Sequence, residues 1–336
     1  MKILIIGGGI FGVVSSLVLS EDTSHEVTLI EKSNDILTKA SRCNHNRLHL
    51  GYHYPRSIET AQQSLIGMSS FFVNFKEAIN TSFDNYYMIE KNGKVTADEY
   101  IKFCDELNVG YKKQWPSIKI NSKNLDLSIV TQEPVFDFDI IKSILKRKLS
   151  NSRINLILNT EVKTKEICEP YDVIINSTYA SLNDINTIFN LEPIIMRFQD
   201  VVVPILEIKI PSIGVTIMDG PYCSVMPMGF STNKFLLYHA KYSVLNEQLG
   251  TTFKNDNYKF CYETLLKKSL EYFEFLTDAK YIDCYRTIRA LPVNNNDARV
   301  TLKEIQITNN KKIINIISGK ISTCWSTAYE LKRMLK

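Results

Sequence analysis

Four glycines near the start of the chain have the spacing of a turn that binds a dinucleotide. Gly7-Gly8-Gly9-Ile10-Phe11-Gly12 fits the pattern G-x-G-x-x-G. In this pattern the first glycine permits a tight turn, the second lets the backbone approach a pyrophosphate, and the third lets helix and strand pack closely. Phosphates at such a turn meet free N–H groups at a helix N-terminus, where the helix dipole favours negative charge. The alternative is a glycine turn that serves packing only.

An acidic residue follows at the distance expected of a ribose ligand. Glu31 lies 19 residues after Gly12, close to the spacing of about 20 at which a carboxylate accepts a hydrogen bond from a ribose hydroxyl. Repulsion by Glu31 disfavours a 2′-phosphate, although the neighbouring Lys32 weakens that argument. Both FAD and NAD use this kind of turn. A second glycine-bearing strand–turn–helix unit at 312–334 favours FAD, because a long cofactor can be held by both ends of the chain.

Three of the chain's five histidines, His45, His49 and His53, lie within nine residues. Such a cluster can hold a proton acceptor near neutral pH. Strand spacing would place His49 and His53 on one face with Gly51 between them and His45 in the preceding loop, so we predict that His49 or His53 is the acid–base. The alternative is that each only hydrogen-bonds cofactor or backbone. We expect no metal site, because no carboxylate lies nearby in the sequence.

Two arginines are candidates for holding an anionic substrate. Arg286 and Arg289 carry guanidinium groups, which pair bidentately with carboxylate or phosphate. A surface salt bridge is an equally good interpretation of each. Tyr238 and His239 follow an apolar run and could present their polar ends to the same pocket, but buried core residues of these types look identical in sequence.

The elements that must position these residues begin with a βαβ unit. Strand-like runs at Lys2–Ile6 and Glu26–Glu31 enclose a helical run at Ile10–Leu19, and strands joined in this way are parallel with a right-handed crossover. Further patterns predict helices at about 58–79, 137–149 and 258–276, strands at 154–162 and 171–180, and a β-rich block over 194–239.

Composition excludes several classes of protein. The 336 residues are 44% hydrophobic and 23% charged with a net charge of +4, so we expect a small-molecule substrate and no nucleic-acid partner. Seven scattered cysteines without a C-x-x-C pair argue against a disulfide framework and for a reducing cytoplasm. The apolar N-terminal run is interrupted by glycines, so we expect neither a signal peptide nor a membrane span. The oligomeric state stays open.

The segment that follows the βαβ unit resembles a known family. Residues 41–54, SRCNHNRLHLGYHY, align without a gap with SGHNSGVLHAGIYY of the L-2-hydroxyglutarate dehydrogenase branch of the D-amino-acid oxidase superfamily. The shared positions are Ser41, Asn44, Leu48, His49, Gly51 and Tyr54. Arg42 and Asn46 stand where the family often has glycine, and Arg47 replaces an aliphatic residue. The run RLHLGYHYPRS at 47–57 matches other flavoproteins, and 171–180, 218–229, 236–243 and 318–325 also resemble this group.

This resemblance implies an α/β (α+β) fold in which a Rossmann-type FAD-binding lobe (1–80, 130–185 and 300–336) is interwoven with an antiparallel-sheet substrate lobe (81–129 and 186–299). It implies an FAD-dependent oxidoreductase that oxidises a CH–NH or CH–OH group of a small polar, anionic substrate by hydride transfer to flavin N5. One alternative is a flavin-dependent tailoring enzyme for a nucleotide-linked sugar. Another is a flavoprotein that has lost turnover and serves as a binding subunit.

The resemblance also assigns cofactor contacts. Gly7, Gly9, Ile10, Phe11 and Gly12 should line the pyrophosphate, and Glu31 with Lys32 the ribose. Ser41, Arg42, Asn44 and Leu48 should run along the pyrophosphate and isoalloxazine, Val162 should meet adenine, and Gly319, Lys320 and Ile321 should place N–H groups near the flavin C2 carbonyl. Covalent attachment of the flavin through Cys43, His45 or Cys324 stays open.

Overall fold

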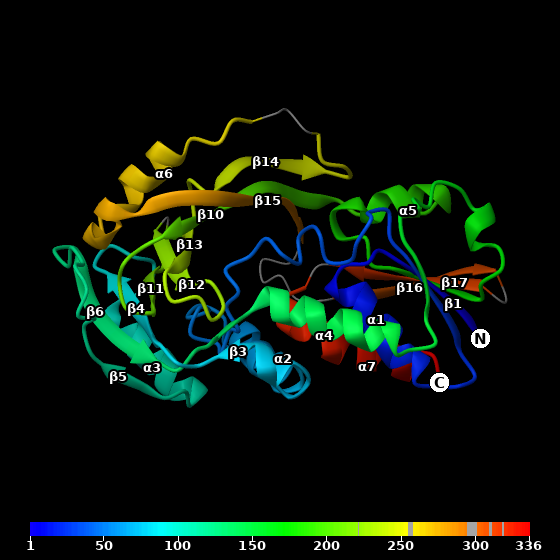
Figure 1. Ribbon diagram of the computed structural model, residues 1–336, viewed down its shortest axis with the longest axis horizontal. Coiled ribbons are helices and arrows are strands. Elements are labelled where there is room, and N and C mark those ends of the chain that lie inside the picture. The colour runs from blue at the N-terminus through cyan, green and yellow to red at the C-terminus, as the bar shows by residue number, and fades with distance from the viewer. Residues whose placement is uncertain (221, 255–257, 294–300, 309–310, 318) are drawn as a thin grey trace.

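The computed structural model describes residues 1–220, 222–254, 258–293, 301–308, 311–317 and 319–336. Within these residues the chain folds around two large sheets that lie side by side along the long axis of the molecule (Figure 1). One has six strands in the order β16-β17-β9-β1-β2-β8 and is largely parallel, and the other has nine strands and is largely antiparallel. This combination confirms the predicted α/β fold class, with a Rossmann-type lobe beside an antiparallel sheet.

The six-stranded sheet carries the N-terminal βαβ unit. β1 (Lys2–Ile6) pairs in parallel with β2 (Glu26–Ile30) on one side and with β9 (Val173–Asn176) on the other. The side chains of β1 are therefore buried on both faces of the sheet after Lys2, and such strands appear in sequence as continuous apolar runs. The other strands of this sheet are β8 (Asn155–Ile157), β16 (Thr301–Thr308) and β17 (Lys311–Ile317).

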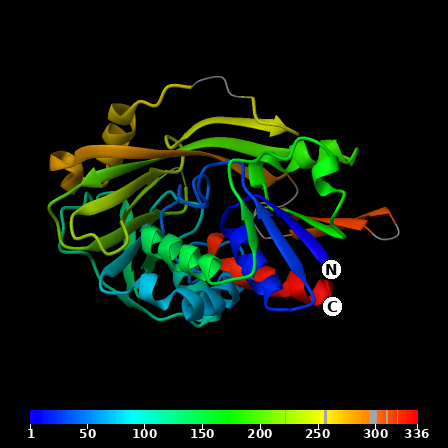
Figure 2. The same cartoon turned by 45° about the vertical axis from the view of Figure 1, so that its right-hand side comes forward.

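Helices α1, α4 and α7 cover one face of this sheet (Figures 1 and 2). α1 (Ile10–Ser20) begins directly after the glycine turn, as predicted. α4 (Phe138–Ser150) follows its N-cap Asp137, whose carboxylate accepts hydrogen bonds from the first N–H groups of the helix. α7 (Cys324–Met334) packs against α1. The two ends of the chain therefore build the same lobe.

The nine-stranded sheet forms the second lobe. β10 (Met196–Glu207) is its longest buried strand and pairs with β13, β14 and β15. β4 (Asp84–Glu90) and β11 (Ile213–Met218) pair in parallel, unlike the other neighbours in this sheet. The remaining strands are β5 (Tyr111–Lys113), β6 (Leu125–Thr131), β12 (Cys223–Pro227), β13 (Lys234–His239), β14 (Val244–Gly250) and β15 (Lys280–Pro292).

Several predicted elements are shorter than their sequence patterns. Of the strand expected over 154–162, the structure shows β8, which covers 155–157 and pairs with β2. Of the strand expected over 171–180, it shows β9, which covers 173–176. The described part of 258–276 contains one α-helix, α6 (Tyr262–Ser269). The remaining elements are α2 (Ile58–Phe75), α3 (Ala97–Leu107), α5 (Leu182–Ile188) and the short pair β3 (Ile79–Asn80) and β7 (Val135–Phe136).

The histidine-bearing segment 41–57 is not a strand, so the predicted strand spacing of its histidines is wrong. Its regular pairing is limited to one bridge between Arg47 and Val135. Asn46 and Gly51 have φ values of +53° and +98°, in the left-handed region that ends an extended run. A Cβ on Gly51 would lie 2.5 Å from the side chain of Leu107. The segment therefore turns sharply where a strand would continue.

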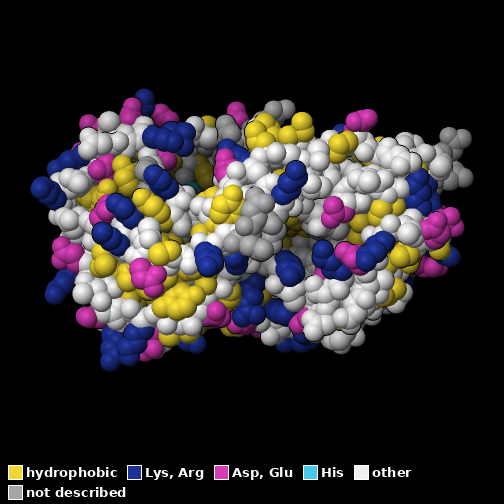
Figure 3. Space-filling view, turned by 90° about the horizontal axis from the view of Figure 1, so that it is seen from above, with side chains coloured by type: hydrophobic (Ala, Val, Ile, Leu, Met, Phe, Trp, Pro, Cys, Tyr) yellow, Lys and Arg dark blue, Asp and Glu magenta, His cyan; other side chains and the backbone are white. Residues whose placement is uncertain are grey.

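The surface seen in Figure 3 mixes charges of both signs, with Lys and Arg side chains interspersed among Asp and Glu. Among the described residues, no helix combines the length and the apolar character that crossing a bilayer requires. Pro221 and Ser318, which belong to segments that resemble the family, lie outside the described residues.

Candidate functional site

A cavity of about 1030 Å³ runs between the two sheets, from the glycine turn to the strands of the second lobe. Pockets for drug-sized ligands span about 300–1,000 Å³, so this cavity can hold a dinucleotide with a small second molecule beside it. The carboxyl ends of β1 and β2 open into it, which is the edge at which parallel sheets bind their ligands. The cavity therefore joins the predicted cofactor end to the predicted substrate end.

The glycine turn has the shape that a pyrophosphate needs. Gly7 has φ +105°, and a Cβ on Gly12 would lie 1.9 Å from the carbonyl oxygen of Gly7, so glycine is required at both positions. Gly9 is the N-cap of α1 without a side-chain cap, and a Cβ there would meet no described atom closer than 3.5 Å. The members of the turn that line the cavity are Gly7, Gly8, Gly9, Ile10 and Phe11. Gly12 lies outside the lining and serves helix packing instead.

Glu31 closes the other side of this end of the cavity. Its carboxylate accepts hydrogen bonds from the N–H groups of Gly8 at 2.6 Å and Ser33 at 2.8 Å. A carboxylate has about four lone-pair sites, so Glu31 can still accept from a ribose hydroxyl. Lys32 and Val162 line the cavity beside it. The residues at this end thus fit the adenosine half of FAD.

The loop after β2 is tied to the glycine turn. The hydroxyl of Ser41 accepts a hydrogen bond from the N–H of Ile10 at 3.0 Å. The amide of Asn44 donates to the carbonyl of Ser41 at 2.9 Å and accepts from the N–H of Asn46 at 2.7 Å. Ser41 and Asn44 line the cavity, and their contact with the cofactor stays a prediction.

Arg42 and Leu48, also predicted as cofactor contacts, do not line the cavity. The guanidinium of Arg42 lies over the rings of Phe138 and Tyr285, 5.9 and 5.3 Å from their centroids, and 3.5 Å from Asp139. Leu48 is fully buried in the core beneath the sheet. Side chains that are adjacent in an irregular loop point in different directions. The aligned segment therefore contains some residues that line the cavity and others that pack against the rest of the protein.

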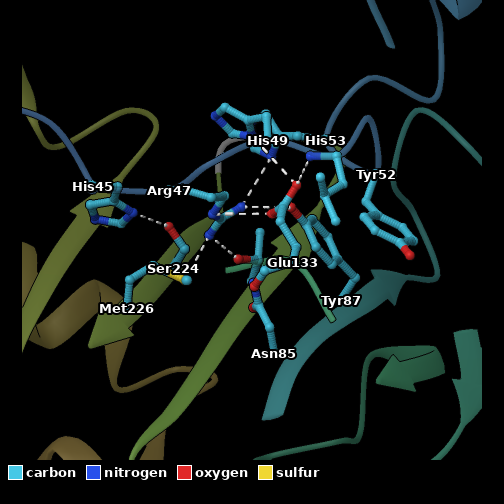
Figure 4. A network of polar contacts seen from close by, with 12 residues as sticks. His45, Arg47, His49, Tyr52, His53, Asn85, Tyr87, Glu133, Ser224 and Met226 are labelled. Carbon is cyan, nitrogen blue, oxygen red and sulfur yellow. Dashed lines mark hydrogen bonds and ion pairs between the residues drawn. The ribbon is translucent and has the colours of Figure 1, made fainter. Parts of the chain in front are cut away.

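A buried ion pair, Arg47–Glu133, lies beside the histidines (Figure 4), and its Arg47 lines the cavity. Arg47 and Glu133 are 5% and 1% exposed, and the Nε of Arg47 lies 3.6 Å from the Oε2 of Glu133. Arg47 also donates to the hydroxyls of Tyr87 at 2.9 Å and Thr216 at 2.5 Å. Glu133 accepts from the Tyr87 hydroxyl on one oxygen and from the Leu50 N–H at 2.8 Å on the other. Both charges are thus paired and hydrogen-bonded, as burial requires.

His49 and His53 both line the cavity, and their ring centroids lie 5.3 Å apart. The Nδ1 of His49 lies 3.8 Å from Glu133 Oε1, whereas the Nδ1 of His53 lies 3.5 Å from a guanidinium nitrogen of Arg47. His45 lies further along, with its Nδ1 3.2 Å from the Ser224 hydroxyl. The turn at Gly51, rather than strand spacing, brings the first two together.

Burial decides the charge states in this cluster. Burial lowers the pKa of His49, with the Glu133 carboxylate opposing it, and lowers that of His53 well below its ordinary value. Burial by itself would raise the pKa of Glu133, but His49, Arg47 and Tyr87 outweigh it and hold that pKa below its usual value. At neutral pH the site therefore holds an ionised Arg47–Glu133 pair and neutral imidazoles, which can accept protons.

Arg289 also lines the cavity, together with Tyr238. From β15 its Nε donates to the side-chain oxygen of Gln199 on β10 at 2.8 Å, and an Nη lies 3.4 Å from the Tyr238 hydroxyl. Among the described residues it makes no ion pair with a carboxylate. A half-buried guanidinium held only by neutral groups can bind an anionic ligand.

Arg286 and His239, the other candidates on this side, do not line the cavity. Arg286 donates to the buried carboxylate of Asp200 at 2.9 Å. His239 accepts from the N–H of Lys241 at 3.2 Å, and burial lowers its pKa to about 4. Both residues stabilise the fold of the second lobe. Side chains three apart on β15 lie on opposite faces of the sheet, which separates Arg286 from Arg289.

The C-terminal turn reaches the cavity. Gly319, with φ +136°, lines it together with Lys320 and Ile321. The ammonium of Lys320 lies 3.4 Å from the ring centroid of Tyr54 and 3.3 Å from the Ser64 hydroxyl. A cation over an aromatic face is electrostatically favourable, so this side chain is fixed beside the histidine segment.

Glu133, Tyr87 and Thr216 were missed by sequence reasoning. Glu133 lies between β6 and β7, Tyr87 on β4 and Thr216 on β11, and nothing in their spacing links them to Arg47. The only available signal was Glu133 itself, an acidic residue between an apolar run and Pro134. Among the described residues, no group of three His, Cys, Asp or Glu side chains could hold a metal ion.

Comparison with known proteins adds to this geometry. No protein-family model matches the chain. Two curated proteins are 27% identical over 277 residues: the FAD-dependent monooxygenase kojA of Aspergillus flavus and a probable FAD-dependent monooxygenase kojA of Aspergillus oryzae. The match covers 73% of this chain and 63% of theirs, so the chain spans less than two thirds of the length of these relatives.

Solved structures match over almost the whole chain. Glycine oxidase from Geobacillus kaustophilus has a TM-score of 0.76 at 13% identity, with 99% of this chain and 94% of that one covered. Iminodiacetate oxidase from a Chelativorans species has a TM-score of 0.74 at 13% identity, with 99% of this chain and 95% of that one covered. L-proline dehydrogenase from P. horikoshii has a TM-score of 0.73 at 16% identity, with 100% and 93% covered. The predicted resemblance to FAD-dependent oxidoreductases is thus confirmed at the level of the fold, while the resemblance to the L-2-hydroxyglutarate dehydrogenase branch stays a prediction.

Proposed function

We propose that this chain is an FAD-dependent oxidoreductase that oxidises a CH–NH or CH–OH group of a small, anionic, amino-acid-like substrate. The observation that carries the proposal is that one cavity is lined both by the glycine turn and Glu31, which follow β1 and β2 of the six-stranded sheet, and by Arg289 of the nine-stranded sheet. The names of the similar proteins, which are FAD-dependent monooxygenases and amine or amino-acid oxidising enzymes, support the same cofactor and substrate class.

The chain's own residues have distinct parts in this proposal. Arg289 and the Tyr238 hydroxyl bind the substrate carboxylate, because the guanidinium lacks a carboxylate partner among the described residues. His49 or His53, both neutral and facing the cavity, accepts the proton of the substrate amine or hydroxyl. Bound FAD would supply the acceptor for the substrate hydride.

The alternative of a tailoring enzyme for a nucleotide-linked sugar is not favoured by either comparison. The curated relatives carry the name monooxygenase, which makes the fate of oxygen a useful measurement. An oxidase releases hydrogen peroxide, whereas a monooxygenase places an oxygen atom in its product.

The proposal is tested on the purified protein in two steps. We expect it to be yellow and to release FAD, and not FMN or NAD, on denaturation. Amino acids, 2-hydroxy acids and sugar acids are then added anaerobically, and we expect carboxylate-bearing amines or hydroxy acids to bleach the flavin band. A colourless protein that takes up no added FAD would refute the proposal. Bleaching by uncharged sugars alone would refute the substrate class.

We expect Arg289→Gln to weaken substrate binding with little change in the limiting rate of flavin reduction. Loss of a charge-assisted hydrogen bond is worth about 1.5–3 kcal/mol, or roughly 10–150-fold in KM. The matched control is Arg286→Gln on the same strand, because Arg286 pairs with Asp200 outside the cavity. The control should lower thermal stability and leave KM unchanged. Equal KM values for Arg289→Gln and wild type would exclude Arg289 as the carboxylate ligand.

A further inference from the structure

We propose that Glu133 is a positioning residue for His49: its carboxylate takes the Nδ1–H of the imidazole, so that Nε2 is the nitrogen that accepts the substrate proton. This inference rests on the proposed function, in which the chain removes a proton from its substrate. The residue itself lies in the connection between β6 of the nine-stranded sheet and β7, which pairs with β3, and was not among the candidates that the sequence suggested.

The two ring nitrogens of His49 have different surroundings. Nδ1 is buried, has no hydrogen-bond partner within reach, and lies 3.8 Å from Glu133 Oε1. The His49 side chain as a whole remains 22% exposed and lines the cavity. A buried N–H beside a carboxylate gains its hydrogen bond when the two groups move to within hydrogen-bond distance. Catalytic contacts of this kind are often longer than that when no ligand is bound. With Nδ1 turned inward, the accessible nitrogen is Nε2.

Glu133 is held firmly enough to orient another side chain. One carboxylate oxygen accepts from the Tyr87 hydroxyl and the other from the Leu50 N–H, while Arg47 supplies the compensating charge. Leu50 follows His49 directly, and the carboxylate oxygen that accepts from the Leu50 N–H is the one that lies 3.8 Å from the His49 Nδ1. Figure 4 shows Glu133 beside the His49 ring. A residue fixed on three sides loses little freedom when it binds a fourth group.

Electrostatics separate the two histidines. His49 faces a carboxylate, which stabilises the imidazolium formed when Nε2 accepts a proton. His53 faces the guanidinium of Arg47 at 3.5 Å, a donor-only cation that opposes protonation. The other groups around His49 are Arg47 and Lys320, whose charges also oppose protonation, and the rings of His53 and Tyr54. The carboxylate is therefore the contact that makes His49, and not His53, the better proton acceptor.

The proton transfer balances without a further reactant. The proton of the substrate N–H or O–H bond passes to Nε2 of His49, and the electron pair of that bond stays on the substrate nitrogen or oxygen. The positive charge that arises on the ring is offset by Glu133, as in other sites where a carboxylate orients a histidine base.

The experiment measures the titration of His49 in the FAD-loaded protein by NMR with ¹⁵N-labelled histidine, and the spectrum of His49→Asn assigns the signal. In wild type we expect neutral His49 to carry its proton on Nδ1. In Glu133→Gln we expect this preference to be lost and the pKa of His49 to fall, because an attractive negative charge has been removed. Single-turnover flavin reduction should slow by at least about tenfold.

Two further variants keep the test decisive. Tyr87→Phe removes another partner of the same carboxylate but leaves its charge, so His49 should keep its Nδ1 proton. If Glu133→Gln does not fold because Arg47 is left unpaired, the double variant Arg47→Met/Glu133→Gln removes both buried charges and is measured in its place. An unchanged His49 tautomer and pKa in the glutamine variant overturn the inference. Wild-type reduction by His49→Asn would instead show that the proposed proton acceptor itself is wrong.

Discussion

His49→Asn is expected to slow anaerobic reduction of the bound flavin by about 10²–10⁴-fold, the usual range for losing a general base, while FAD content stays unchanged. The imidazole lines the cavity, and its described contacts are with Glu133, His53 and Tyr54 and not with the glycine turn or Glu31, so we expect cofactor binding not to depend on it. Asn keeps a polar side chain of similar size but cannot accept a proton. The measurement is the single-turnover reduction rate at saturating substrate, which separates chemistry from binding.

The pH dependence of the same rate should follow the charge state of His49. A general base works in its neutral form, so the wild-type rate rises as the pH increases through the pKa of the ring. Because burial lowers the pKa of His49, this rise should lie on the acid side of the ordinary value of about 6.5. The rise should be absent in His49→Asn.

His53→Asn is the matched control for this prediction. His53 faces the same cavity but is opposed by Arg47, so its replacement should cost much less than that of His49. A larger loss in His53→Asn would exchange the roles of the two residues. If both variants reduce the flavin at wild-type speed, the histidines are structural and the proton leaves through another group such as Tyr238.

Arg47→Met is expected to destabilise the folded protein by about 3–5 kcal/mol, because it leaves the charge of Glu133 buried without its partner. The hydroxyls of Tyr87 and Thr216 also lose their donor. The measurement is urea unfolding of the FAD-loaded protein, monitored by circular dichroism and by flavin fluorescence. A loss of this size would show that the buried Arg47–Glu133 pair stabilises the folded protein.

Arg56→Met provides the comparison. Arg56 pairs with Asp219, and the two side chains are 57% and 16% exposed, so solvent screens this pair more than Arg47–Glu133 and its loss should cost less. If both arginine variants unfold at the same urea concentration, the buried pair contributes no more than an exposed one and the argument for its structural role fails. The double variant Arg47→Met/Glu133→Leu should recover much of the loss, since it removes the unpaired charge.

Lowering the pH should also destabilise the folded protein, because it protonates Glu133. The folded-state pKa of this carboxyl is lowered despite burial, so its contribution is present above its unfolded pKa and disappears as the pH falls through the folded value. We expect the difference in stability between wild type and Arg47→Met to shrink accordingly at low pH.

The sequence alone determined the cofactor end of this protein. A short apolar run, three spaced glycines, a helix and Glu31 all lie within about thirty residues, so local steric and helix-dipole requirements specify their arrangement. For the same reason the helices at α1 and α4 were found nearly residue for residue. The family resemblance extended this to the C-terminal turn, where Gly319, Lys320 and Ile321 line the cavity.

Only the tertiary structure decided the substrate end. Arg286 and Arg289 look equivalent in sequence, but one pairs with a buried carboxylate and the other faces the cavity. Glu133 is more than eighty residues from His49 along the chain, and the two meet because a turn of the histidine segment bridges to Val135. Which side chains are buried, which residues they contact and which face of a sheet they occupy all depend on residues far apart in the sequence. No local sequence pattern therefore predicts them.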